Sequence, residues 1–167
     1  MAFRVGTSAT GTFQTWASAD SLPDKPGNYY LTKDVTLNDI WKVPRGGVNL
    51  CLNGHGIVMA EKHCVVGVKE DVTLNVYDCG RNEHRYTITN GLATVNDELT
   101  ERYLTFTGGY ITGGASPMAG TSGCGIYIDS GGKVTLNGGT IIGNAGDSFG
   151  GGIYNRGSFT MNGGATT

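Results

Sequence analysis

The chain alternates apolar and polar residues over several short stretches that follow one template. Five stretches share it: Val48-Asn-Leu-Cys-Leu-Asn-Gly, Val72-Thr-Leu-Asn-Val, Leu104-Thr-Phe-Thr-Gly-Gly, Val134-Thr-Leu-Asn-Gly-Gly and Phe159-Thr-Met-Asn-Gly-Gly. Their first residues are 24, 32, 30 and 25 positions apart. A period of two is typical of β-strands with one buried face. It predicts ten inward side chains: Val48, Leu50, Val72, Leu74, Leu104, Phe106, Val134, Leu136, Phe159 and Met161.

The polar positions of the same stretches form two outward columns. The first column is Asn49, Thr73, Thr105, Thr135 and Thr160, and the second is Cys51, Asn75, Thr107, Asn137 and Asn162. Stacked threonine and asparagine side chains suit β geometry and hydrogen-bond to one another across strands. We therefore expect ladders of these residues on the outer surface.

Two further motifs recur at similar distances. Gly125-Ile-Tyr-Ile returns as Gly152-Ile-Tyr-Asn after 27 residues, and Tyr110-Ile-Thr-Gly-Gly returns as Thr140-Ile-Ile-Gly-Asn after 30. Internal repeats of about 20–50 residues indicate architectures in which similar units stack. Short strands punctuated by Gly-Gly and Asn-Gly suit a chain that turns corners every few residues. The pattern predicts an all-β fold, a parallel β-helix or solenoid.

The first 47 residues do not follow the repeat. They contain both tryptophans and three of the four prolines. Because the end of a solenoid exposes apolar core and unpaired strand edges, its terminal unit must be atypical and cover them. We expect residues 1–47 to form an N-terminal cap with the first strands, in which Phe13, Trp16 and Leu22 lie on a short helix or loop. Residues 48–167 form the coils, which we expect to be truncated at the C-terminal end.

Composition narrows the choice of partners. The 29 glycines come without a Gly-X-Y period and with only 4 prolines, which excludes collagen and proline-rich disorder. A net charge of −2 and a pI near 5.8 give no electrostatic reason to expect nucleic acid or an anionic membrane. No apolar run is long enough to span a bilayer.

The repeats resemble a known family. Gly150-Gly-Gly-Ile-Tyr-Asn, together with Val134-Thr-Leu-Asn-Gly-Gly, resembles the Gly-Gly-Gly-Ile-Tyr-Asn repeats of secreted or cell-wall-anchored proteins of gut Firmicutes, in the pectin-lyase-like superfamily. Gly27-Asn-Tyr-Tyr-Leu-Thr and Val48-Asn-Leu-Cys-Leu-Asn-Gly look like the segment that precedes those repeats. The resemblance implies a right-handed parallel β-helix and an extracellular bacterial location. It does not define the function, because such repeats accompany adhesins, enzymes and stalks.

Metal and thiol chemistry is open at several positions. Soft and imidazole ligands occur at Cys51, His55, His63, Cys64, Cys79 and His84, but no four of them have a recognisable zinc spacing. The alternative is that Cys64 and Cys124 are small core residues, since free cysteine is often buried. A Cys51–Cys79 disulfide is conceivable, but we expect buried thiols. We predict no metal site and no cofactor.

The acidic residues define no catalytic site. On this fold the resemblance implies lyases or glycosidases that use acidic residues of the outer face. The candidates are Asp71, Asp78, Glu83, Asp97, Glu98, Glu101 and Asp129. No two of them share a position in the template, and the dense run at 97–102 is typical of a solvated loop. We therefore assign no catalytic residue.

Aromatic residues are the best candidates for ligand contact. Tyr110, Tyr127 and Tyr154, together with Trp41, would form a strip for sugars if exposed, because each ring offers apolar area with a polar group. The alternative is that Tyr127 and Tyr154 are stacked packing residues.

The sequence leaves three functions open. The first is a noncatalytic, adhesin-like or structural β-helix module of a bacterial surface or secreted protein that binds a glycan or a host protein. The second is a fragment of a carbohydrate-active enzyme, a polysaccharide lyase or glycosidase. The third is a module that associates end to end into fibres.

Overall fold

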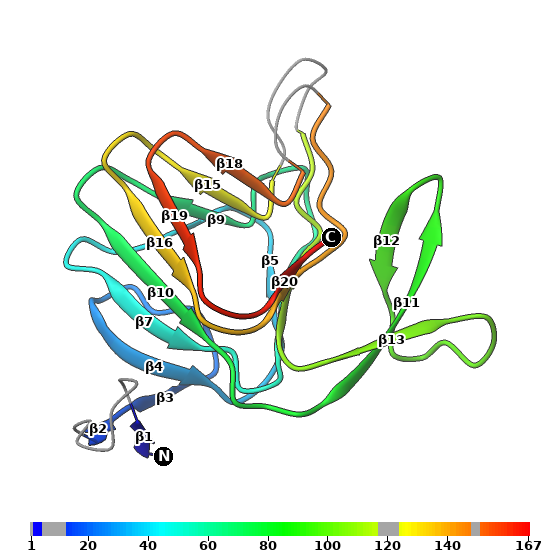
Figure 1. Ribbon diagram of the computed structural model, residues 1–167, viewed down its shortest axis with the longest axis horizontal. Helices are drawn as coiled ribbons and strands as arrows, with labels where there is room; N and C mark the ends of the chain where they lie inside the picture. The colour runs from blue at the N-terminus through cyan, green and yellow to red at the C-terminus, as the bar shows by residue number, and fades with distance from the viewer. Residues whose placement is uncertain (1, 5–12, 117–123, 148–150) are drawn as a thin grey trace.

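The protein consists of β-strands. The computed structural model describes residues 2–4, 13–116, 124–147 and 151–167, with the backbone alone for residues 2–4 and 13–15. No helix occurs among these residues, which confirms the prediction of an all-β fold. The strands form three parallel sheets of six, five and four strands, an antiparallel sheet of three and an antiparallel pair. In Figure 1 the antiparallel sheet of three strands stands to one side of the parallel sheets.

Each parallel sheet collects strands from the whole length of the chain. The six-stranded sheet contains β3 (Ala17–Ala19), β4 (Gly27–Leu31), β7 (Val48–Cys51), β10 (Thr73–Tyr77), β16 (Lys133–Leu136) and β19 (Ser158–Met161). The five-stranded sheet contains β5 (Val35–Leu37), β8 (Gly56–Met59), β14 (Tyr110–Thr112), β17 (Thr140–Ile141) and β20 (Ala165–Thr166). The four-stranded sheet contains β6 (Trp41–Lys42), β9 (Val66–Val68), β15 (Ile126–Ile128) and β18 (Ile153–Asn155).

The chain passes through the three sheets in a fixed order. From β4 onward it enters the six-stranded sheet, then the five-stranded sheet and then the four-stranded sheet, and returns to the first. We call each such passage a circuit. Strands β4 to β6 and β7 to β9 make the first two circuits, β10, β14 and β15 the third, and β16 to β18 the fourth. Neighbouring strands within each sheet are parallel, so equivalent residues of successive circuits lie side by side.

The core lies between the sheets and is formed by their inward columns. Leu50, Leu74 and Leu136 of the six-stranded sheet are fully buried, as are Ile57 and Ile126 of the other two sheets. Burial of such a side chain contributes about 1.5–3 kcal/mol. Six of the ten side chains predicted to point inward are buried in the six-stranded sheet or directly before it: Val48, Leu50, Val72, Leu74, Val134 and Leu136. On the edge strand β19, Phe159 is only half-buried and Met161 is 46% exposed, because no further strand of the described chain covers them.

The register of β10 differs from the template by two residues. Leu74, and not Val72, lies opposite Val48, and Leu74 also lies opposite Val134. Val72 is nevertheless buried, because a shift of two residues keeps every side chain on the same face of a strand. The template therefore identified the correct face of this strand with the wrong partners.

The corrected register produces an asparagine ladder on the outer face. Asn28, Asn49 and Asn75 lie side by side, and the column continues as Thr135 and Thr160. The amide nitrogen of Asn49 donates to Oδ1 of Asn28 at 2.7 Å, and that of Asn75 donates to Oδ1 of Asn49 at 2.7 Å. The ladder thus links three circuits through side chains. Thr73 and Thr105, which the template placed in this column, lie elsewhere.

Residues 83–107 form an insertion that leaves the stacked circuits, and we call it the arm. The arm follows β10 and precedes β14 in the chain. Its strands β11 (Glu83–Thr89), β12 (Leu92–Val95) and β13 (Leu104–Thr107) pair antiparallel with one another (Figure 1). The prediction that Leu104 and Phe106 belong to an inward column is therefore wrong. Leu104 is 52% exposed on the arm, and Phe106 packs against His84.

The chain leaves and re-enters the circuits at one point, the arm root. There Oδ1 of Asp78 accepts hydrogen bonds from the backbone N–H groups of Gly54 and Gly80, at 2.8 and 3.2 Å. Its Oδ2 accepts one from the backbone of Gly109 at 2.9 Å. A single carboxylate thus holds the outgoing chain, the returning chain and a turn of the preceding circuit. Gly108 has a φ of 99°, which favours glycine there.

The N-terminal segment is extended. Ala17–Ala19 is strand β3, which pairs with β4. Of the two expected forms of this segment, a short helix or a loop, the helix is absent from the described residues, and Leu22 lies in a loop. Trp16 is buried, with its ring edge-on to Tyr77 at a centroid distance of 5.5 Å, and Leu22 packs against the core. Phe13 lies in β2 (Phe13–Thr15), which pairs antiparallel with β1 (Ala2–Arg4), and its side chain lies outside the described part.

Two leucine truncations distinguish the circuits from the arm. Leu74→Ala removes a fully buried side chain, and we expect it to lower the free energy of unfolding by about 2–5 kcal/mol. Leu104→Ala removes a side chain that is 52% exposed, and we expect a change below about 1 kcal/mol. Urea denaturation measures both. Equal losses for the two variants would contradict the position of Leu104 on the arm.

Candidate functional site

The outer face of the four-stranded sheet carries a column of unlike residues. The register places Lys42, Gly67, Tyr127 and Tyr154 side by side on β6, β9, β15 and β18. Their chain neighbours Trp41, Val66, Ile126 and Ile153 form the adjacent column, of which the first three are buried in the core. The period of two therefore directs both tyrosines outward.

The two tyrosine rings stack on each other. Their centroids are 5.3 Å apart, the ring planes differ by 11°, and both side chains are half-buried. Arg156 lies beside them, and its hydrogen bond with Tyr127 is the main cause that raises the pKa of the guanidinium group above its usual value. The two rings form a short aromatic platform with a cation at its edge.

A recess lies next to this platform, because Gly67 has no side chain. It has a volume of about 330 Å³, and its lining includes Ile40, Lys42, Lys69 and Tyr127. This volume is at the lower end of the range for small-molecule sites, about 300–1,000 Å³. His63 and Cys64 complete the lining. The recess therefore has an aromatic wall, a backbone floor and two ammonium groups.

One of these ammonium groups is paired. Nζ of Lys69 lies 3.5 Å from Oδ2 of Asp129. The N–H of Ser130 is the main cause that lowers the pKa of the Asp129 carboxyl, and Lys69 lowers it further. Lys42 is exposed at the other side of Gly67. The two lysines can donate hydrogen bonds to a ligand in the recess from two directions.

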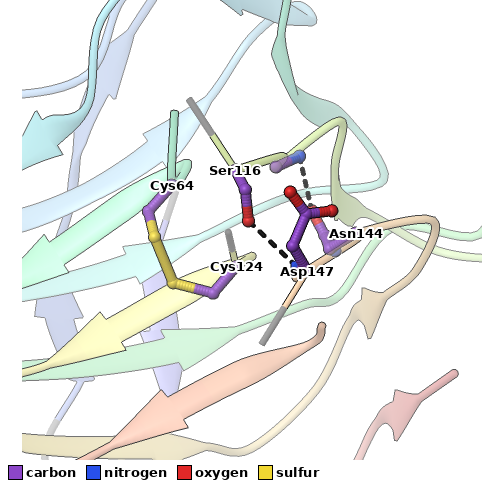
Figure 2. The surroundings of a disulfide bond; sticks show 6 residues. Cys64, Ser116, Cys124, Asn144 and Asp147 are labelled. Carbon is purple, nitrogen blue, oxygen red and sulfur yellow. Dashed lines mark hydrogen bonds between the residues drawn. A yellow bond between two sulfur atoms is a disulfide. The ribbon is translucent and has the colours of Figure 1, made fainter. Parts of the chain in front are cut away.

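A disulfide bond supports the wall of the recess. Cys64 and Cys124 precede β9 and β15, their Cα atoms are 4.6 Å apart, and their sulfur atoms are bonded (Figure 2). The expectation that these residues are free core thiols is therefore wrong. Next to the bond in Figure 2, Oγ of Ser116 accepts from the backbone N–H of Asp147 at 3.0 Å.

Buried Asn144, also drawn in Figure 2, joins neighbouring circuits. Its Oδ1 accepts from the N–H of Gly114 at 2.8 Å, while its amide nitrogen donates to the carbonyl groups of Ile111 and Ile142 at 3.1 Å each. All these contacts lie inside the protein, so Asn144 supports the fold and not ligand contact.

The other two predicted aromatic residues are buried. The ring of Trp41 points into the core, and its Nε1 donates to the carbonyl of Pro23 at 3.0 Å. Tyr110 is 5% exposed at the arm root, edge-on to His84 and Phe106. Of the four candidates, the structure brings only Tyr127 and Tyr154 together at the surface.

Within the arm, the buried His84 pairs with the exposed Asp97. Nδ1 of His84 lies 2.7 Å from Oδ2 of Asp97, and Nε2 lies 2.9 Å from the carbonyl oxygen of Gly54. A carbonyl oxygen only accepts, so Nε2 carries a hydrogen and donates it. The nitrogen that would act on a substrate is therefore occupied, and only 4% of the residue is exposed. This pair anchors the arm.

The remaining candidate ligands are dispersed. No group of three histidine, cysteine or acidic side chains within the described ranges is arranged to hold a metal ion. Nδ1 of His55 lies 3.4 Å from Oδ1 of Asp34, and Cys51 lies beside Cys79. Asp34 itself accepts from the backbone N–H of Gly56 at 2.8 Å. These side chains serve the turns between strands.

The sequence interpretation missed the recess residues Lys42, Gly67 and Lys69. The available signal was Gly67 itself, a single glycine between the apolar residues Val66 and Val68. A glycine inside a strand marks a position where something approaches the backbone closely. The register that aligns it with Lys42 and Tyr127 is visible only in the structure.

Comparison with protein-family models, curated proteins and solved structures finds no match for the chain. In the described part of the chain no helix has the length and apolarity needed to cross a membrane.

The environment of Tyr110 predicts that its hydroxyl group ionises at a higher pH than an ordinary tyrosine. Burial, followed by the charges of Asp34 and Asp97, raises its pKa from 10.0 to about 12. Because the raised pKa favours the neutral form, the stability it contributes is complete below pH 10 and is lost as the pH rises through about 12. When tyrosinate absorbance is measured against pH, the wild type should show a component that titrates near pH 12, and this component should be absent from Tyr110→Phe. Identical titrations of the two proteins would contradict this environment.

Proposed function

We propose that the chain is a right-handed parallel β-helix that serves as a noncatalytic glycan-binding module. The fixed order of the three sheets and the parallel pairing of successive circuits support the β-helix. Parallel strands joined by a crossover are right-handed in about 98% of cases, which supports the handedness. Residues 27–42 already contain a complete circuit, so the proposed cap lies before them.

The glycan-binding role rests on one observation, the stacked tyrosines beside the recess at Gly67. A sugar ring has an apolar face and a rim of hydroxyl groups, and an aromatic side chain provides the matching apolar area. Lys42 and Lys69 can donate to the hydroxyl groups while the ring lies against Tyr127. A few polar groups around an apolar surface are the usual composition of a small-molecule site.

The noncatalytic character is supported by the hydrogen bonds of three acidic residues. Asp34 and Asp78 each accept hydrogen bonds from backbone N–H groups, and Asp97 is held by His84 and by the N–H of Arg85. Glycoside hydrolysis requires two carboxyl groups that face the scissile bond. The carboxylates of these three residues are used to hold turns and the arm.

The Cys64–Cys124 bond supports a location outside the cytoplasm. Disulfide bonds persist in oxidising surroundings and are rare in the cytosol of most organisms. We propose that the module is part of a secreted or surface-exposed bacterial protein, as the resemblance of its repeats implies. Its ligand would then be an extracellular glycan.

A glycan array tests the binding face. If the wild-type chain binds a glycan, Tyr127→Ala and Tyr154→Ala should each weaken binding at least tenfold, about 1.4 kcal/mol. Gly67→Ala should also weaken it, because the added methyl group occupies the recess and meets only the flexible end of Ile40, at 2.9 Å. Tyr103→Ala is the matched control, since this exposed tyrosine lies next to the arm strand β13.

Release of unsaturated or reducing sugar is followed in the same samples. Product formation would show an enzyme and contradict the noncatalytic proposal. If Tyr127→Ala, Tyr154→Ala and Gly67→Ala all bind the glycan as the wild type does, the site lies elsewhere on the protein. If the chain binds a host protein and no glycan, the ligand is a protein and the glycan proposal is contradicted.

A further inference from the structure

The two remaining cysteines meet at the arm root. Cys51 is the last residue of β7, and Cys79 follows β10 by two residues, where the chain leaves for the arm. Their sulfur atoms are 3.2 Å apart. A disulfide bond has a length of about 2.05 Å, so the sulfur atoms need to approach by only about 1.2 Å.

The surrounding backbone holds the pair in place. Asp78, next to Cys79, binds the N–H groups of Gly54, Gly80 and Gly109. Gly80 lies directly against the backbone of Gly54, with no space for a side chain between them. The turn after β7 and the start of the arm are therefore fixed relative to each other before any bond forms.

The two thiols differ in access. Cys51 points outward between Tyr30 and Tyr77 of the adjacent strands but is fully buried. Burial, followed by the hydrogen bond with Cys79, raises the pKa of Cys51 to about 12. Cys79 is exposed. An oxidant therefore reaches Cys79 first, because the thiolate at an accessible site is the reactive form.

We propose that Cys51 and Cys79 form a second disulfide bond, which ties the arm root to the preceding circuit. The Cys64–Cys124 bond supports this, since conditions that maintain one disulfide also act on a second pair of thiols in contact. The two bonds lie at different corners: one joins the approaches to β9 and β15, and the other joins the ends of β7 and β10.

The reaction proceeds by exchange with a low-molecular-mass disulfide such as glutathione disulfide. The Cys79 thiolate attacks one sulfur atom, the S–S bond of the reagent breaks, and one thiol leaves. The Cys51 sulfur then loses its proton and attacks Sγ of Cys79, which expels the second thiol. In total two protein thiols lose two electrons and two protons, and one reagent disulfide becomes two thiols. The second step is the slower one, because burial raises the pKa of Cys51.

Peptide mapping of the folded, full-length chain tests the bond. Cleavage after lysine and arginine places each cysteine in its own peptide, namely residues 46–62, 63–69, 70–81 and 103–133. After treatment with glutathione disulfide and alkylation of free thiols, we expect peptide 46–62 linked to 70–81, and 63–69 linked to 103–133. A Cys79 peptide that carries glutathione while Cys51 remains a free thiol at the end of the reaction would overturn the proposal.

Cys79→Ser is the control, because Cys79 is exposed and its substitution leaves the buried Cys51 in place. In this variant the 46–62 peptide should remain unlinked. Oxidation of the wild type should raise the thermal midpoint by roughly 5–10 °C, and oxidation of the variant should not change it. A linked pair with no rise in the midpoint would overturn the role of the bond in tying the arm root.

Discussion

The lateral register of the parallel strands is the constraint on which the rest of the structure depends. Once Leu74 lies opposite Val48 and Val134, every aliphatic side chain of these strands enters the same core. The same register brings the amide groups of Asn28, Asn49 and Asn75 into a hydrogen-bonded column outside. A register error of one residue would expose the core and bury the ladder at once, so the two columns specify the same pairing.

The candidate site follows from an exception to this regularity. Stacked circuits place like residues above one another, as Tyr127 and Tyr154 show. Gly67 interrupts their column and leaves a recess whose aromatic wall is the next residue in the stack. The arm is a second exception, since it replaces the direct connection between β10 and β14 by three antiparallel strands. Asp78 and the two cysteines lie where that replacement begins.

Much of this arrangement could be predicted from the sequence, because strand periodicity is local information. The alternation around Val48 and Val134 identified the inward face correctly, and the repeated Gly-Ile-Tyr motif placed Tyr127 above Tyr154. Leu104 has the same local pattern but pairs antiparallel on the arm, and no local signal separates the two cases. The two-residue shift of β10 was invisible because both registers bury the same face.

The remaining features depend on distances between residues far apart in sequence. Cys64 and Cys124 are separated by 60 positions, and only the pairing of β9 with β15 brings their Cα atoms to 4.6 Å. Trp41 and Tyr110 had the right chemistry for a sugar site but point into the protein.

The most direct test of the account is the backbone register in solution, measured by proton–proton contacts in nuclear magnetic resonance spectra. The register of β10 predicts contacts of Asn75 with Asn49 and with Thr135 across the parallel strands. Contacts of Thr73 with Asn49 instead would contradict it.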